Sequence, residues 1–152
     1  MSENRYLSVS GIVLRDNKVL LVRQSYGSVK GLLTIPGGYL QENEMPDDAL
    51  EREILEETSI VVKTRSLVAI RFALNDWWAI FTADYISGEP VPDKNENSEA
   101  FFLDIDDALS HPDLTYTTKE VLLQYGKKPS MQKSNFCPAG IDHKEYMLFM
   151  LQ

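Results

Sequence analysis

The side chains most able to do chemistry in this chain lie between Gly38 and Ile60, in a window with eight acidic residues and a single basic one, Arg52. The window holds nearly all of the net charge of −8 that the 152 residues carry at pH 7. Carboxylates crowded in this way repel one another and reduce stability unless something binds them. A hard divalent cation takes oxygen ligands, so we expect this window to bind one.

A helix is predicted from Asp47 to Thr58, with Pro46 in its first turn. The segment contains no Gly and no further Pro, and strong helix formers dominate it. Three carboxylates stand at i, i+3 and i+4 and project from one face: Glu53, Glu56 and Glu57. They lie near the negative end of the helix dipole, where acidic side chains are unfavourable. A bound metal ion would offset that cost; the alternative interpretation is a solvated acidic face.

The spacing in this window resembles the signature box of the Nudix hydrolase family. That box reads Gly, five residues, Glu, seven residues, and then Arg-Glu-apolar-x-Glu-Glu-x-Gly-apolar. Eight of its nine fixed positions are matched, by Gly38, Glu44, Arg52, Glu53, Ile54, Glu56, Glu57 and Ile60. At the ninth, Ser59 replaces Gly, so we expect a slightly different path out of the helix. Asn43 replaces a frequent Gly in the preceding loop, and Asn tolerates the left-handed conformation.

The resemblance implies an enzyme that hydrolyses a pyrophosphate linkage in a nucleoside diphosphate joined to another group. It implies Mg²⁺ as the cofactor, with Mn²⁺ as a substitute, and both ions suit carboxylate ligands. Such ions screen the anionic phosphate oxygens and lower the pKa of a bound water. The implied metal ligands are Glu53, Glu56 and Glu57, together with the Gly38 carbonyl. Glu53 is either a ligand or the group that orients the water.

The other catalytic roles fall on residues around these ligands. Arg52 is expected to hold a box carboxylate in place through a charge-assisted pair, and Glu44 to support the loop. A general base must lie within hydrogen-bond reach of the water. In this family it is often a Glu outside the box, so Glu99 is our first candidate and Glu96 the second, with Glu53 as the alternative inside the box.

Substrate contacts are predicted from two basic residues and a group of aromatic ones. Arg23 and Arg71 are candidates to meet phosphate oxygens, and Trp77, Trp78 and Phe72 to stack on a base. The alternatives are ordinary surface arginines and aromatic residues of the core. The sequence shows none of the substrate signals of the family outside the box. A nucleoside triphosphate, a nucleotide sugar and a dinucleotide polyphosphate therefore all remain open.

The whole chain, residues 1–152, is predicted to form one α/β domain. Strand patterns occupy 6–14, 18–24, 31–35, 60–69, 73–85 and 100–105, and helical ones 106–110 and 116–125. The resemblance implies an α/β/α sandwich with a mixed central sheet and the box as a loop–helix–loop along one side. The tail, residues 126–152, is expected either to fold back on this body or to meet a second copy, which would give a homodimer.

Composition excludes several other classes of protein. The N-terminus lacks the pattern of a signal peptide, and no run of apolar residues is long enough for a membrane span. A single cysteine, Cys137, excludes an internal disulfide and favours the cytoplasm. An acidic chain does not suit a nucleic-acid duplex. A non-catalytic nucleotide-binding module of the same family is the main alternative function, although the box keeps all of its carboxylates.

Overall fold

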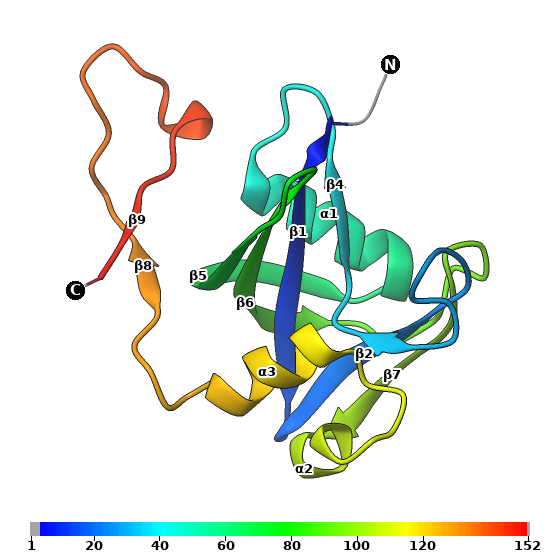
Figure 1. Cartoon of the computed structure of the whole chain (residues 1–152). Helices are drawn as coiled ribbons and strands as arrows, with labels where there is room; N and C mark the ends of the chain where they lie inside the picture. The colour runs from blue at the N-terminus through cyan, green and yellow to red at the C-terminus, as the bar shows by residue number, and fades with distance from the viewer. Residues whose placement is uncertain (1–3, 152) are drawn as a thin grey trace.

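A mixed nine-stranded sheet runs through residues 4–151, which are the residues described by this computed structural model (Figure 1). Its strands are β1 (Asn4–Arg15), β2 (Lys18–Gln24), β3 (Leu33–Thr34), β4 (Gly37–Leu40), β5 (Val61–Phe72), β6 (Trp77–Ser87), β7 (Asn97–Asp104), β8 (Met131–Lys133) and β9 (Phe149–Met150). The main strand order is β3-β2-β1-β6-β5-β8-β9, while β4 pairs with β1 and β7 with β2. β1 and β6 run parallel, and the other pairs are antiparallel.

Helices cover both faces of this sheet, which gives the α/β/α sandwich that the sequence predicted. They are α1 (Pro46–Thr58), α2 (Ile105–Leu109) and α3 (Tyr116–Gln124), with a short 3₁₀ turn, η1 (His143–Glu145), in the tail. Alternation along β1 divides the core, because successive side chains of a strand point to opposite faces. Val9 and Val13 pack with α1, whereas Ile12 packs on the side of α2 and α3. No helix within residues 4–151 is long and apolar enough to cross a membrane.

The loop–helix–loop around α1 keeps its shape despite the departures from the family pattern. Pro46 occupies the first turn, and Leu50 and Ile54 are fully buried against the sheet. Ser59 adopts the left-handed conformation, with φ 63°, and its N–H bonds to a carbonyl four residues back. This is the turn that Gly normally makes, and its cost to a non-glycine residue is roughly 1 kcal/mol. Asn43 is also left-handed, with φ 60°, as predicted.

Most predicted elements are present, with shifted ends. The strand predicted at 31–35 is wrong in length, since only Leu33–Thr34 pairs with β2. The predicted strand at 73–85 begins instead at Trp77, because residues 73–76 form the turn that joins β5 to β6. β7 begins at Asn97, three residues before the predicted start, since its pairing with β2 extends to Gln24.

The tail adds two short strands to the edge of the sheet. β8 pairs with β5, β9 pairs with β8, and the Phe149 ring lies 5.5 Å from the Phe81 ring in an edge-to-face contact. Of the two expected outcomes, the tail therefore contacts the body of its own chain. Residues 134–148 between these strands project beside the sheet as an arm (Figure 1).

Candidate active site

A cleft of about 570 Å³ is bounded by α1, the ends of several strands and the start of α3. Its charged lining residues are three acids, Glu53, Glu57 and Glu96, and one base, Arg71. Aromatic and hydroxyl side chains complete much of the wall: Tyr26, Tyr39, Trp78, Ser8, Ser10, Thr34, Thr115 and Thr117. The cleft therefore offers carboxylate oxygens, hydrogen-bonding groups and flat apolar surfaces to one ligand.

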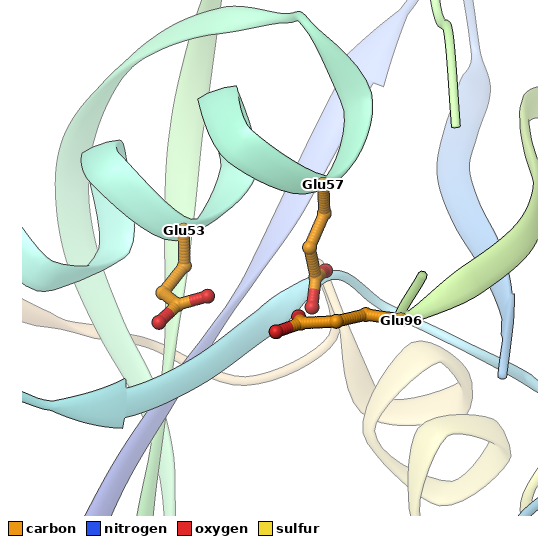
Figure 2. Close-up of side chains that lie close together, drawn as sticks. All are labelled: Glu53, Glu57 and Glu96. Atoms are coloured by element: carbon orange, nitrogen blue, oxygen red, sulfur yellow. The ribbon is translucent and has the colours of Figure 1, made fainter. Parts of the chain in front are cut away.

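Three carboxylates converge in this cleft. Glu53 and Glu57 come from α1, and Glu96 comes from the segment just before β7 (Figure 2). One oxygen atom from each lies within 4.8 Å of the others. The spacing of four residues on α1 places Glu53 and Glu57 on the same face one turn apart, while Glu96 reaches them from a distant part of the sequence.

Burial raises the pKa of two of these carboxylates, Glu53 and Glu57. Glu57 is only 4% exposed, and burial raises its pKa well above the ordinary value. The N–H of Gly37 donates to Glu57 at 3.2 Å and lowers this pKa, whereas the charges of Glu53 and Glu96 raise it further. Burial likewise raises the pKa of Glu53 to about 7, although its contact with Arg52 acts in the opposite direction. A divalent cation would reverse this preference, since it favours the charged form of both.

The backbone beside the carboxylates is shaped to let them approach. A Cβ atom on Gly38 would lie 2.4 Å from the carboxyl carbon of Glu53, and one on Gly37 would lie 2.0 Å from the Val9 carbonyl oxygen. Only glycine at these positions lets β4 lie against both α1 and β1. Three converging oxygen donors beside a side-chain-free strand fit a hard divalent cation.

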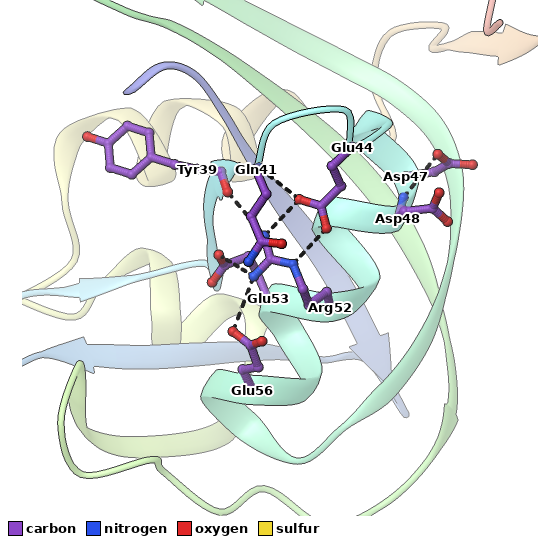
Figure 3. A network of polar contacts seen from close by, with 8 residues as sticks. All are labelled: Tyr39, Gln41, Glu44, Asp47, Asp48, Arg52, Glu53 and Glu56. Atoms are coloured by element: carbon purple, nitrogen blue, oxygen red, sulfur yellow. Dashed lines mark hydrogen bonds and ion pairs between the residues drawn. The ribbon is translucent and has the colours of Figure 1, made fainter. Parts of the chain in front are cut away.

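Arg52 holds the acidic loop and helix together (Figure 3). Its Nε and Nη2 donate to the two carboxylate oxygens of Glu44 at 2.7 and 2.9 Å, and its Nη1 donates to Glu53 at 2.8 Å and to Glu56 at 3.2 Å. A further bond reaches the Tyr39 carbonyl at 3.2 Å. The Arg52 bonds are the main reason that the pKa of Glu44 is lowered. This is the orienting geometry expected of Arg52, with Glu44 as its support.

Two predicted acids lie outside the carboxylate group. The Glu56 side chain is 58% exposed and contacts Arg52. Glu99, our first candidate for the base, forms an ion pair with Arg23 at 3.0 Å and does not line the cleft. Glu96, the second candidate for the base, lies with Glu53 and Glu57 in the carboxylate group.

Of the two arginines predicted to contact substrate, one lines the cleft and the other does not. Arg71 lines the cleft, pairs with Asp76 and lies over the Trp78 ring at 5.4 Å. Arg23 does not line it, because its guanidinium binds Glu99, Asp113 and the Gly31 carbonyl.

Trp77 does not line the cleft; it points to the opposite face of the strand from Trp78, and its ring meets Phe72 edge to face at 4.9 Å. Of the aromatic residues predicted to contact substrate, Trp78 is the one that lines the cleft, and it shares its face with the buried Ile80. Strand alternation from Ile80 could have distinguished the two tryptophans. Tyr26 and Tyr39 also line the cleft. We did not single them out, and no local sequence pattern marks them.

Comparison with known proteins places the chain in a family. A family model of the NUDIX domain matches residues 5–125. The chain is 29% identical over 126 residues to an ADP-ribose pyrophosphatase of Methanocaldococcus jannaschii, a match that covers 78% of this chain and 72% of that protein. It is 36% identical over 95 residues to the NAD-capped RNA hydrolase NudC of Vibrio parahaemolyticus, which covers 58% of this chain but only 34% of NudC.

Solved structures agree with this assignment. The chain superimposes on a Nudix hydrolase from Nitrosomonas europaea with a TM-score of 0.72 and 25% identity, over 82% of this chain and 72% of the other. A MutT Nudix hydrolase from Burkholderia pseudomallei has the same fold, with a TM-score of 0.67 and 24% identity over 79% and 97% of the two chains. The family match extends over more than half of the sequence and includes the box, the cleft-lining residues and strands β2 to β7. The chain is thus a member of the Nudix family, a MutT-like pyrophosphohydrolase.

Proposed function

We propose that this enzyme uses Mg²⁺, with Mn²⁺ as a substitute, to hydrolyse the pyrophosphate linkage of a nucleoside diphosphate joined to a second group. The observation that carries the proposal is the convergence of Glu53, Glu57 and Glu96 within a cleft that also contains Trp78 and Arg71. A substrate with two or more phosphates is strongly anionic, and among the described residues this cleft has one basic lining residue, Arg71. A cation on the carboxylates supplies the charge that the cleft lacks.

The proposed metal ligands are Glu53, Glu57 and Glu96, with Glu56 and the Gly38 carbonyl as the further ligands implied by the family box. When bound, the ion would lower the pKa of a coordinated water and screen the phosphate oxygens. Arg52 supports this set by fixing the Glu53 carboxylate through its Nη1 at 2.8 Å. Glu44 in turn fixes Arg52 in a bidentate pair.

For the general base we favour Glu96 over Glu99, since its carboxylate has two oxygens, of which one would face the cation and the other would accept the proton. Glu99 is engaged by Arg23 on the neighbouring strand, whereas Glu96 belongs to the carboxylate group itself. Glu53, with a pKa raised to about 7, is the alternative acceptor within the helix, since a base works best when its pKa lies near the working pH. The chosen carboxylate takes a proton from the water as the water oxygen bonds to phosphorus, the bond from that phosphorus to the bridging oxygen breaks, and the other phosphate-bearing half of the substrate leaves.

ADP-ribose is the first substrate to test. The M. jannaschii relative, which this chain matches along most of its length, carries that activity in its name, and NudC acts on NAD-capped RNA. Trp78 and the cleft tyrosines offer stacking surfaces for an adenine ring, and Arg71 offers a donor to a ribose or phosphate oxygen. We propose a free small molecule as the substrate, handled by a single domain in the cytoplasm, with no nucleic-acid duplex or membrane as partner.

A substrate panel with product identification tests the proposal. The wild-type chain should release AMP and ribose 5-phosphate from ADP-ribose only when Mg²⁺ or Mn²⁺ is present, and nucleoside triphosphates, nucleotide sugars and dinucleotides complete the panel. Glu57→Gln should lower kcat by about a hundredfold or more while the fold survives. Glu42→Gln removes an exposed carboxylate of the loop before α1 and should leave kcat unchanged. Nucleotide binding by the wild type without any hydrolysis product would instead identify the non-catalytic module.

A further inference from the structure

We propose that Asn97 is a positioning residue that holds Glu96 against α1 by capping the C-terminus of that helix. This inference rests on the proposed function, because it assigns a role to Asn97 in building the carboxylate group. Asn97 lies outside the family box and is the first residue of β7. Its side chain is completely buried.

The last carbonyl groups of α1 have no partners within the helix. The Leu55 carbonyl accepts from the Ser59 N–H at 2.9 Å, and the Thr58 carbonyl accepts from the Val91 N–H at 2.9 Å. The Glu57 carbonyl accepts from the amide Nδ2 of Asn97 at 3.2 Å. Two of these three bonds come from residues 91–97, so the segment before β7 serves as the cap of the helix that carries Glu53 and Glu57.

The same segment carries Glu96 and forms a turn that internal hydrogen bonds stabilise. One carboxylate oxygen of Asp93 accepts the N–H groups of Asn95, Glu96 and Asn97, at 3.0, 2.9 and 3.2 Å. The Glu96 carbonyl accepts from the Ser25 N–H at 3.0 Å. The Glu96 backbone is therefore held by Asp93 and Ser25, and the turn as a whole is tied to α1 through Asn97.

Stability alone does not explain an amide at this position. The Asn97 Oδ1 is buried and has no hydrogen-bond partner among the described residues. An unsatisfied buried acceptor is costly, and an apolar side chain of similar size would avoid that cost. Reversing the amide would place Oδ1 against the Glu57 carbonyl, where two acceptors repel. What the amide uniquely supplies is a donor aimed at the backbone of Glu57, the residue whose carboxylate meets that of Glu96.

The effect of losing Asn97 on cation binding follows from how the Glu96 turn is held: internally by Asp93, and against α1 by the bond from Asn97 to the Glu57 carbonyl. If the bond to the Glu57 carbonyl is lost, the turn that carries Glu96 keeps the Val91 bond to the Thr58 carbonyl but loses its attachment beside Glu57. The cation site then keeps its two helical carboxylates, and the third is held less firmly. Residues that orient metal ligands from behind typically change metal affinity by about 10–100-fold, so we expect a change in this range.

The experiment measures Mn²⁺ affinity by calorimetry in wild type, Asn97→Leu, Glu96→Gln and the double variant. Asn97→Leu should bind Mn²⁺ at least about tenfold more weakly. The double variant should be no weaker than Glu96→Gln alone, because Asn97 acts through Glu96. Wild-type affinity in Asn97→Leu, or losses that simply add in the double variant, would overturn the inference.

Controls separate positioning from general destabilisation. Asn95→Ala changes an exposed side chain of the same turn, and Ser66→Ala removes a buried hydroxyl that bonds to Thr82 at 2.6 Å outside the cleft. Neither should alter Mn²⁺ affinity, although Ser66→Ala should lower the unfolding temperature.

Amide hydrogen exchange without metal supplies an independent readout. In Asn97→Leu, the N–H groups of Val91 and Glu96 should exchange about tenfold faster, while those in the middle of β1 keep their rate. Unchanged exchange at both positions would also reject the role of Asn97. If the wild type binds no cation and hydrolyses no substrate, the proposed function fails, and the exchange measurement still decides whether Asn97 holds the turn.

Discussion

Raising the pH without a divalent ion should destabilise the folded protein, and adding the ion should restore it. The pKa of Glu53 rises from 4.5 to about 7 on folding because the side chain is buried. The folded protein is therefore more stable with Glu53 protonated than with Glu53 ionised. Below pH 4.5 Glu53 is protonated in both the folded and the unfolded protein, so the pH does not affect stability through this residue. As the pH rises from 4.5 to about 7, the unfolded chain releases the proton while the folded protein still holds it, and the free energy of unfolding falls.

The size of the effect follows from the same pKa values. Moving a carboxyl pKa from 4.5 to about 7 corresponds to about 3 kcal/mol, and the Glu53 side chain is only 12% exposed, so solvent reduces this little. Glu57 acts in the same direction, since burial raises its pKa as well. Glu44 acts in the opposite direction, because its pKa is lowered by Arg52, and its contribution is lost only below its ordinary value of 4.5.

Urea unfolding checks this prediction, with the free energy of unfolding measured near pH 5 and near pH 8, with EDTA and with Mg²⁺. We expect a loss of about 3 kcal/mol at the higher pH in EDTA, largely recovered with Mg²⁺, because an ion that binds only the folded state stabilises it. Glu53→Gln should be more stable than wild type near pH 8 in EDTA and should respond less to both pH and Mg²⁺. Glu42→Gln should behave as wild type. Equal stability at the two pH values in EDTA would refute the reasoning.

Three further substitutions test the geometry of the cleft. Arg52→Lys should weaken Mn²⁺ binding and lower kcat by about 10–100-fold, because an ammonium cannot reproduce the bidentate pair with Glu44 while also holding Glu53; unchanged titration calorimetry would contradict this. Gly38→Ala should cost about 1–3 kcal/mol in urea unfolding and weaken Mn²⁺ binding, because the added Cβ would lie 2.4 Å from the Glu53 carboxyl carbon. Trp78→Ala should raise KM about tenfold through a lost stacking surface, whereas Trp77→Ala, on the other face, should not; equal effects in steady-state kinetics would remove Trp78 from the site.

The acidic segment could be predicted well because its signals are local. Pro46 and the helix formers after it determine the start and length of α1, and the spacing of Glu53 and Glu57 determines the face that they share. The two positions where the sequence departs from the family box also follow local rules, since Asn43 and Ser59 adopt the left-handed conformations that their turns require. The strand ends were predicted less well, because they depend on pairing with distant residues such as Gln24 with Asn97.

The choice between Glu96 and Glu99 shows why the rest of the site could not be read from the sequence. Glu99 lies within β7 directly opposite Arg23 on β2, so the sheet register fixes it in a cross-strand ion pair. Glu96 precedes the strand, and its direction is determined by a turn that depends on Asp93 and on the amide of Asn97. Its approach to Glu57 is a contact across 39 residues of sequence, set by hydrogen bonds that no periodic pattern encodes. A general base outside a helical motif should therefore be sought in the turns that cap the helix, where backbone hydrogen bonds fix a side chain relative to the helical ligands.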